Sequence, residues 1–328
     1  MRHDPTPAIE PFDCVRAHEL AEKPVDRKWL IEGLWADAGV GICAGAPKST
    51  KSWMALDMAV SVASGTACLG RFAVGRPGPV LLYAAEDPLS TVRSRLAGIC
   101  QCRGLALADL GVHVITEPVM RLDAVGHQER LRETVARVAP RLLILDPLVR
   151  IYGKVDENSA AEVSAFLAYL RGLQRELDLA ILVVHHARKA QAGDHEVGQA
   201  LRGSGDLHAW VDSLLYLKRT KEGLRLTIEH RSSPAPEPLT LALVDRDGRP
   251  PRLEPVEARA SDPAGGLGAK LIHLLTRAPG GLTVEEMRAT LGVRKQTVVA
   301  LVRALERGGH VVRDDRGFRA VPDHAHGD

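Results

Sequence analysis

The sequence predicts an α/β domain with a central, mostly parallel sheet, followed by a small second domain of mixed helices and strands. Two observations lead to this prediction. From Trp29 to about Val244, short apolar runs alternate with longer amphipathic segments, as strands and crossover helices do. A stretch rich in proline and glycine then separates this region from a compact carboxy-terminal segment.

The length fits about two domains at roughly 150 residues each. We expect five parts in the 328 residues: an arm at 1–28, the α/β domain at 29–245, a linker at 246–268, the small domain at 269–321 and a tail at 322–328.

The composition excludes several classes of protein. Hydrophobic residues make up 45% and charged residues 26%, which excludes wholesale disorder. No apolar run approaches the ~20 residues of a membrane span, and the first residues lack the apolar core of a secretory signal. The five scattered cysteines, with only the lone Cys100-x-Cys102 pair, indicate reduced thiols in a cytoplasmic protein rather than a disulfide framework or a metal site.

The apolar runs of the first domain are expected to be strands. Five of them alternate with helical patterns: Val40–Ala44, Val80–Ala84, Val112–Ile115, Leu142–Leu145 and Leu179–Val184. Three later ones form an antiparallel finish: Ser213–Leu217, Leu224–Glu229 and Leu239–Val244. The expected helices are Ser52–Ser64, Leu89–Cys102, Gln128–Val138 and Ala160–Leu177.

A phosphate-binding loop is expected between the first strand and the first helix. This context is the one required of a Walker A loop, whose backbone N–H groups and helix N-terminus surround phosphates. Lys51 would reach the β- and γ-phosphates of ATP, and the Ser52 hydroxyl would bind Mg²⁺. The nucleotide-binding residues would be Gly45, Ala46, Pro47, Lys48, Ser49, Thr50, Lys51 and Ser52.

One position of this loop departs from the pattern. Thr50 stands where a second glycine is expected, and a β-branched residue resists the backbone angles that glycine adopts there. Two interpretations follow. Either the loop binds nucleotide with weakened affinity, or the turn only resembles a phosphate loop.

Polar residues end three of the predicted strands. Asp146 follows an apolar strand in the Walker B arrangement and would hold Mg²⁺ through water. Glu86 ends another strand, where it could orient an attacking water as a general base, or lie in a solvated acidic turn. His185 and His186 end a third strand beside the expected phosphates.

Together these residues resemble the RecA-like P-loop ATPases, and more narrowly the RepA-type hexameric replicative helicases. Four strings carry the likeness, which covers roughly residues 29–244: GAPKSTKSWMALDMAVSVASG, LLYAAEDP, LLILDPL and VVHHARK. The resemblance implies that Glu86 is the catalytic base, that Arg95 is linked to the active site, and that His186 or His185 senses the γ-phosphate.

The resemblance also implies contacts with DNA and with neighbouring subunits. The loop after the histidines, Ala187 to about Asp206, corresponds to a DNA-facing loop in the channel of a hexameric ring, with Arg188, Lys189 and Arg202 on phosphates. An ordinary solvated connection is the alternative. In the related DnaB-type helicases the arginine finger corresponds to Arg231, with Lys218-Arg219 as the competing choice. At the RepA-type position, near Leu214 or Leu215, this chain has no basic residue.

The segment 269–321 predicts a winged helix-turn-helix. Thr283 and Glu286 form a capping box at its second helix, and Val293–Arg307 would be the recognition helix. Arg294, Lys295 and Arg303 face outward there as candidate DNA contacts. Ten lysines and arginines against five acidic residues give this segment a net charge of +5, the footprint of a duplex DNA binder. A protein-docking module is the alternative.

Two main functions follow from the sequence. The first is an ATP-hydrolysing motor on DNA, a homohexameric helicase with ATP and Mg²⁺ as cofactors, of a replication or mobile-element system. The alternative is an ATP-gated DNA-binding regulator that does not unwind DNA. An inactive nucleotide-binding scaffold rests on Thr50 alone.

Overall fold

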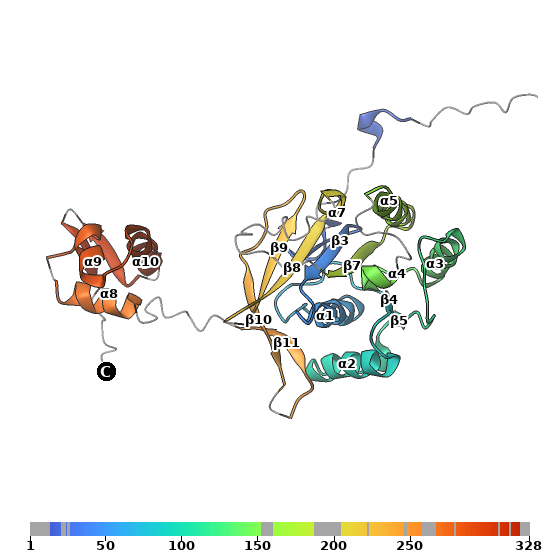
Figure 1. The fold of residues 1–328 in the computed structure, drawn as a ribbon, viewed down its shortest axis with the longest axis horizontal. Helices are drawn as coiled ribbons and strands as arrows, with labels where there is room; N and C mark the ends of the chain where they lie inside the picture. The colour runs from blue at the N-terminus through green and yellow to red at the C-terminus, as the bar shows by residue number, and fades with distance from the viewer. Residues whose placement is uncertain are drawn as a thin grey trace, which may run out of the picture. The chain divides into compact units, whose positions relative to one another are not determined.

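The computed structural model describes residues 14–20, 24, 27–151, 160–186, 205–221, 223–245, 248–256, 267–278, 280–307, 309–314 and 316–321. The chain divides into two compact units, Met1–Pro255 and Val256–Asp328. Among the described residues, the amino-terminal unit has two hydrophobic cores and the carboxy-terminal unit has one. Figure 1 shows the helices and strands of both units.

A sheet of nine described strands forms the centre of the amino-terminal unit, in the order β11-β10-β9-β8-β3-β7-β6-β4-β5. Six neighbouring strands, from β8 to β5, run parallel, and β9, β10 and β11 continue from β8 as antiparallel strands. This arrangement confirms the predicted α/β class and the antiparallel finish. The strands are β3 (Val40–Gly45), β4 (Val80–Ala84), β5 (Val112–Val114), β6 (Leu142–Asp146), β7 (Ala180–His186), β8 (Ser213–Thr220), β9 (Gly223–His230), β10 (Leu239–Val244) and β11 (Arg252–Pro255).

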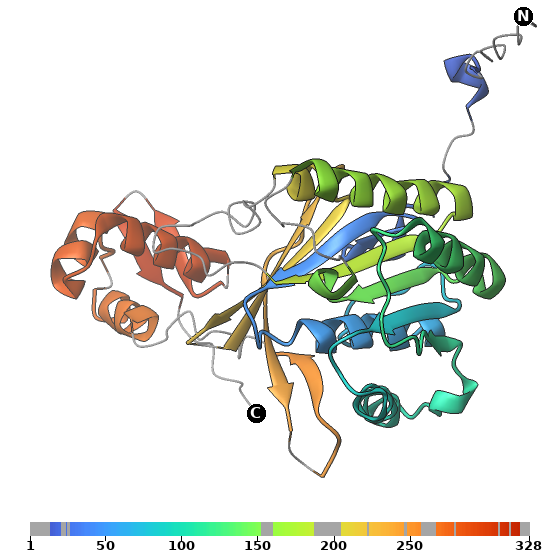
Figure 2. The same ribbon diagram turned by 45° about the vertical axis from the view of Figure 1, so that its right-hand side comes forward.

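Helices cover both faces of the parallel strands, which explains why these strands are continuous apolar runs (Figure 2). Successive strand residues point to opposite faces, so Leu143 and Ile144 enter different cores. The first core packs against α1 (Lys51–Ser64) and α2 (Leu89–Cys102). The second core packs against α3 (Val125–Val138) and α5 (Ala160–Leu177).

Several elements of this unit lie where the sequence predicted none. A short helix, η1 (Ala17–Glu19), lies in the predicted arm, and η3 (Leu107–Asp109) precedes β5. Before β3, β1 (Trp29–Ile31) pairs with β2 (Trp35–Ala36). Two helices of this unit are short: α4 (Leu148–Ile151) follows β6, and α7 (Gly205–Trp210) precedes β8.

The structure corrects part of the predicted linker, because Arg252–Pro255 forms the edge strand β11. Its four residues pair with Leu241–Val244 of β10. Leu253 is 4% exposed and packs in the first core, which stabilises the strand despite the neighbouring prolines. Proline is tolerated at this position because an edge strand leaves one row of backbone groups unpaired.

The carboxy-terminal unit is a winged helix-turn-helix, as predicted. Three helices, α8 (Leu267–Thr276), α9 (Val284–Leu291) and α10 (Lys295–Arg307), pack with a hairpin of β12 (Val311–Asp314) and β13 (Gly317–Ala320). The predicted capping box is present: Thr283 accepts a hydrogen bond from the Glu286 N–H, and the Glu286 carboxylate accepts one from the Thr283 N–H. Gly292 ends α9 with a φ of 65°, which favours glycine.

A buried ion pair anchors helix α1, whose first turn belongs to the predicted phosphate loop. Asp57 accepts hydrogen bonds from the Arg103 guanidinium at 2.6 Å and from the Leu69 N–H at 2.8 Å. Arg103 also donates to Ser61 and Thr66. Arg103 caps α2, so this network fixes the two helices beside each other.

Among the described residues, the structure has no helix with the length and apolar character that a membrane crossing needs.

We expect Asp57→Ala to lower the free energy of unfolding by about 3 kcal/mol, because it leaves the largely buried charge of Arg103 without its carboxylate partner. Urea unfolding followed by tryptophan fluorescence measures this change, since all four tryptophans precede residue 256. Glu176→Ala is the control: it breaks the exposed pair with Arg132 and should change the free energy of unfolding far less, because solvent screens this pair. Equal losses in the two variants would contradict an anchoring role for Asp57.

Candidate nucleotide site

The predicted phosphate loop adopts a tightly constrained backbone between β3 and α1. Lys48 and Thr50 both have left-handed angles, with φ values of 62° and 61°. Gly45 is required by close approach, because an added Cβ would lie 2.4 Å from the Leu217 carbonyl oxygen and 2.6 Å from Ser49 Oγ. The loop therefore has a defined shape in the free chain.

Thr50 takes the left-handed conformation that its β-branched side chain resists. Its φ and ψ are 61° and 23°, and its hydroxyl donates a hydrogen bond to the Ser49 carbonyl oxygen at 2.6 Å. The backbone that a second glycine would adopt is thus formed by threonine, at a cost of roughly 1–2 kcal/mol. Since this angle is already present without nucleotide, the strain is a cost of folding rather than of binding.

Lys51 is 4% exposed and points into the loop. Its ammonium donates hydrogen bonds to the carbonyl oxygens of Gly45 at 3.0 Å and Ala46 at 2.9 Å. Burial lowers the pKa of Lys51, while the negative charges of Asp146 and Glu86 act in the opposite direction. The lysine is held beside the loop, where an anion would stabilise its charged form.

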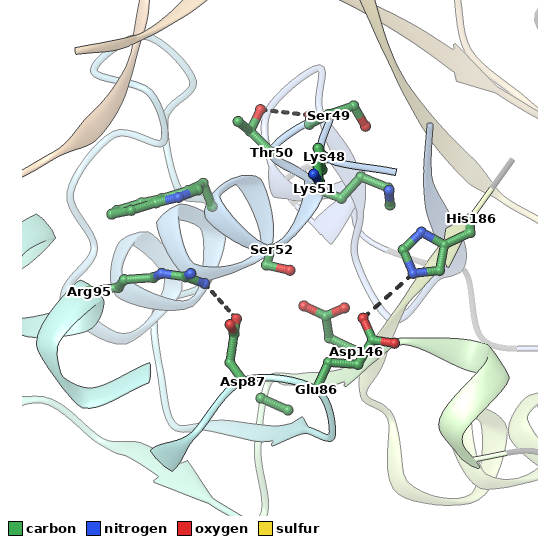
Figure 3. A pocket seen from close by; sticks show the side chains of 12 residues that line it. Lys48, Ser49, Thr50, Lys51, Ser52, Glu86, Asp87, Arg95, Asp146 and His186 are labelled. Atoms are coloured by element: carbon green, nitrogen blue, oxygen red, sulfur yellow. Dashed lines mark hydrogen bonds and ion pairs between the residues drawn. The ribbon is translucent and has the colours of Figure 1, made fainter. Parts of the chain in front are cut away.

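A cavity of about 330 Å³ opens beside the loop and the first turn of α1 (Figure 3). Its wall combines cationic, hydroxyl and carboxylate groups from the ends of β3, β4, β6 and β7. The lining residues are Lys48, Ser49, Thr50, Lys51, Ser52, Trp53, Ala84, Glu86, Asp87, Arg95, Asp146 and His186. Of the residues to which the sequence assigned nucleotide chemistry, Lys48–Ser52, Glu86, Arg95, Asp146 and His186 line this cavity, whereas Gly45, Ala46, Pro47 and His185 are not among its lining residues.

The Asp146 carboxylate and the Ser52 hydroxyl, two oxygen ligands suited to Mg²⁺, lie together in this cavity. Burial raises the pKa of Asp146 to about 6, and a hydrogen bond with Ser52 acts against this rise. Among the described residues, no cluster of three or more acidic, histidine or cysteine side chains could hold a metal alone. One carboxylate and one hydroxyl fit Mg²⁺, because this ion binds few protein ligands and completes its shell with phosphates and water.

A buried hydroxyl also fits an anionic ligand. Ser49 is 1% exposed, and its Oγ has no hydrogen-bond partner among the described residues. A buried hydroxyl without a partner is costly, so a donor in this position suits a phosphate oxygen.

Glu86 lies at the edge of the cavity beside Asp146. The Ala85 N–H donates to the Asp146 carbonyl oxygen at 2.8 Å, which fixes the end of β4 against β6. The Glu86 carboxylate accepts a hydrogen bond from Arg150 Nε at 3.1 Å, and its other oxygen lies 3.7 Å from His186 Nε2. The sequence did not identify Arg150, since only the fold joins positions 64 residues apart.

The two histidines at the end of β7 have different surroundings. His186 lines the cavity, whereas His185 is not among the lining residues. Burial lowers the pKa of His185 to about 4, with the charges of His186 and Lys51 adding to the effect. Of the two candidates for a phosphate sensor, His186 is the one in a position to meet a ligand.

Arg95 and Trp53 line the cavity and contact each other. The Arg95 guanidinium pairs with Asp87 at 2.5 Å and stacks on the Trp53 ring at 5.2 Å from its centroid. The likeness to RecA-like ATPases pointed to Arg95. Trp53 carried no such signal, since a tryptophan on a helix packs most often in a core.

The two candidate finger arginines lie at opposite ends of the β8–β9 hairpin. Arg219 donates two hydrogen bonds, at 3.0 and 2.7 Å, to the Lys48 carbonyl oxygen of its own phosphate loop. Arg231 lies at the other end, next to the residue pair Ser213 and His230, and donates to the carbonyl oxygens of Ala209 and Val211. Of these two described arginines, Arg219 is the one that contacts the phosphate loop of its own chain.

The candidate DNA contacts fall in two groups. Arg188, Lys189 and Arg202 lie outside the described residues. Arg294, Lys295 and Arg303 are exposed, at the start and along the outer side of α10, while Val298, Val302 and Leu305 are buried in the core of the carboxy-terminal unit. The inward and outward faces of the predicted recognition helix are therefore as expected.

Models of known protein families match the sequence in both units. A family model described as "AAA domain" matches residues 5–192, more than half of the chain, and one described as "MarR family" matches residues 269–319. No match was found among curated proteins.

The solved structures that are similar to the chain include two of low sequence identity. One describes a DnaB-like replicative helicase and its interactions with primase: it is 17% identical with a TM-score of 0.49, over 64% of this chain and 56% of that one. The chain thus spans just over half the length of that helicase. The other is the RadB recombinase, 17% identical with a TM-score of 0.47, over 67% of this chain and 92% of that one.

We expect Thr50→Gly to raise the free energy of unfolding by about 1 kcal/mol, because glycine adopts the left-handed angle without strain. Calorimetric titration should find the affinity for MgATP changed less than about threefold, since the loop has this angle before a ligand arrives. Thr134→Gly on helix α3 is the control and should lower stability slightly. A gain in affinity of about tenfold or more would show that Thr50 opposes binding itself.

Proposed function

Because the chain belongs to the AAA domain family, a family of ATPases, we propose that its amino-terminal unit binds ATP with Mg²⁺ and hydrolyses it to act on DNA. The observation that carries this proposal is the convergence of Lys51, Ser52, Asp146, Glu86 and His186 on one cavity, from four neighbouring strand ends. A cationic loop facing carboxylates is what the cleavage of a phosphate anhydride by water requires.

Each residue of the cavity has a role in this reaction. The backbone N–H groups of Lys48–Lys51 and the ammonium of Lys51 bind the β- and γ-phosphates, for which Lys51 leaves the carbonyl oxygens of its own loop; Pro47 has no N–H to donate. Ser52 and Asp146 hold Mg²⁺, the latter through water. When bound, Mg²⁺ offsets charge on the phosphate oxygens.

Glu86 acts as the general base and His186 as the sensor. Glu86 accepts a proton from water as the water oxygen bonds to the γ-phosphorus and the bond to the β-phosphate oxygen breaks, which gives ADP and phosphate. His186, already within 3.7 Å of Glu86, donates to a γ-phosphate oxygen and so links this phosphate to the segment that follows β7.

The motor interpretation is a homohexameric helicase similar to the RepA type. In it, Arg188, Lys189 and Arg202 contact single-stranded DNA in the ring channel, Arg231 or Arg219 reaches a neighbouring site as the finger, and the winged helix binds duplex DNA or a partner. The winged helix-turn-helix, with exposed Arg294 and Lys295, favours the second candidate, a DNA-binding regulator timed by ATP hydrolysis.

Lys51→Ala should weaken MgATP binding about 100-fold, the equivalent of roughly 3 kcal/mol for a charge-assisted hydrogen bond.

Glu86→Gln should keep binding and lower kcat about 100-fold or more, because the amide cannot accept the proton. Calorimetry and phosphate release measure the two effects, and Glu117→Gln, at an exposed pair with Arg130, is the control. Normal turnover by Glu86→Gln would remove Glu86 as the base.

Single-stranded DNA should raise the ATPase rate about tenfold or more if the protein is a motor, because translocation couples the ring channel to each hydrolysis cycle. Phosphate release is measured with poly-dT and with a duplex of mixed sequence. The Arg294→Ala/Lys295→Ala variant should keep stimulation by poly-dT and lose duplex binding. Stimulation by one duplex sequence alone would instead support the regulator.

A further inference from the structure

Two side chains, His186 at the end of β7 and Arg150 on the helix that follows β6, meet at the carboxylate of Glu86. The strands β7, β6 and β4 are neighbours in the sheet, and they lead to His186, Arg150 and Glu86. Arg150 Nε lies 3.1 Å from Glu86 Oε1, and His186 Nε2 lies 3.7 Å from Oε2. Arg150 thus makes the closer contact and the direct hydrogen bond.

Arg150 approaches Glu86 from outside the nucleotide cavity. It does not line the cavity, whereas Glu86 and His186 do. A guanidinium in this position does not replace a phosphate ligand, and it leaves the second carboxylate oxygen on the side of His186, which lines the cavity. This arrangement suits a residue that acts through Glu86 rather than on ATP.

The backbone of Arg150 is fixed by the short helix α4. Leu148 and Ile151 of this helix are buried in the second core. The Leu122 N–H donates to the Ile151 carbonyl oxygen at 2.9 Å, and the Arg150 N–H donates to the Pro147 carbonyl oxygen at 3.1 Å. The Arg150 side chain, 62% exposed, therefore extends from a rigid base.

We propose that Arg150 is a positioning residue that holds the Glu86 carboxylate toward the attacking water; this inference rests on the proposed ATP hydrolysis. A glutamate that is 41% exposed has several rotamers open to it, and a hydrogen bond to one oxygen selects among them. An exposed ion pair contributes little to stability, so its effect lies in the orientation of the base.

Steady-state ATP hydrolysis by the full chain tests this role. Arg150→Ala should lower kcat about tenfold or more, with KM for ATP and the melting temperature unchanged, because substrate binding does not involve Arg150. Arg150→Lys should recover part of the loss, since lysine keeps a donor there. Arg137→Ala, at an exposed arginine on α3, is the control and should leave kcat unchanged.

The double variant Glu86→Asp/Arg150→Ala tests whether Arg150 affects ATP hydrolysis through Glu86 or independently of it. Aspartate is too short to keep the contact, so Arg150→Ala should add less than about twofold to the loss already caused by Glu86→Asp. If the kcat losses of the two single variants multiply in the double variant, Arg150 acts on the phosphates or on another subunit, and the proposal is overturned. Unchanged kcat in Arg150→Ala, with Glu86→Gln inactive, would overturn it and leave the proposed function standing.

Discussion

The turn between Gly45 and Lys51 must place the backbone N–H groups that follow Pro47 around one volume, and the surrounding structure depends on this constraint. Two left-handed residues, Lys48 and Thr50, give the turn its shape. Arg219 holds the Lys48 carbonyl oxygen on the outside of the loop, and Lys51 holds the carbonyl oxygens of Gly45 and Ala46. The strain of a left-handed threonine persists because a buried strand and a buried helix determine both ends of the loop.

Strand order converts this loop into a site for chemistry. β3, β7, β6 and β4 lie next to one another and parallel, so the residues at their carboxyl ends meet at one edge of the sheet. The loop provides positive charge, Asp146 and Glu86 provide negative charge, and His186 lies between them. Helices on both faces bury the strands, and the Asp57–Arg103 pair fixes α1 against α2, so these groups project from rigid elements.

Much of this arrangement was predictable from the sequence because it depends on local patterns. The apolar runs located the strands, and the strings around Lys51, Glu86, Asp146 and His186 located the cavity. The edge strand β11 was missed because prolines surround it, and its stability comes from β10 and the core. The contacts of Arg150 and Arg219 were missed because they join residues 64 and 171 positions apart, and no local pattern encodes such a pairing.

Titration calorimetry of the wild-type protein with ATP, in the presence and absence of Mg²⁺, tests the central claim most directly. A loop shaped for phosphate in the free chain predicts saturable binding of one ATP per chain, weakened when Mg²⁺ is withheld. Absence of saturable heat up to millimolar MgATP would contradict the account, because the loop, its lysine and the facing carboxylates would then have no ligand in common.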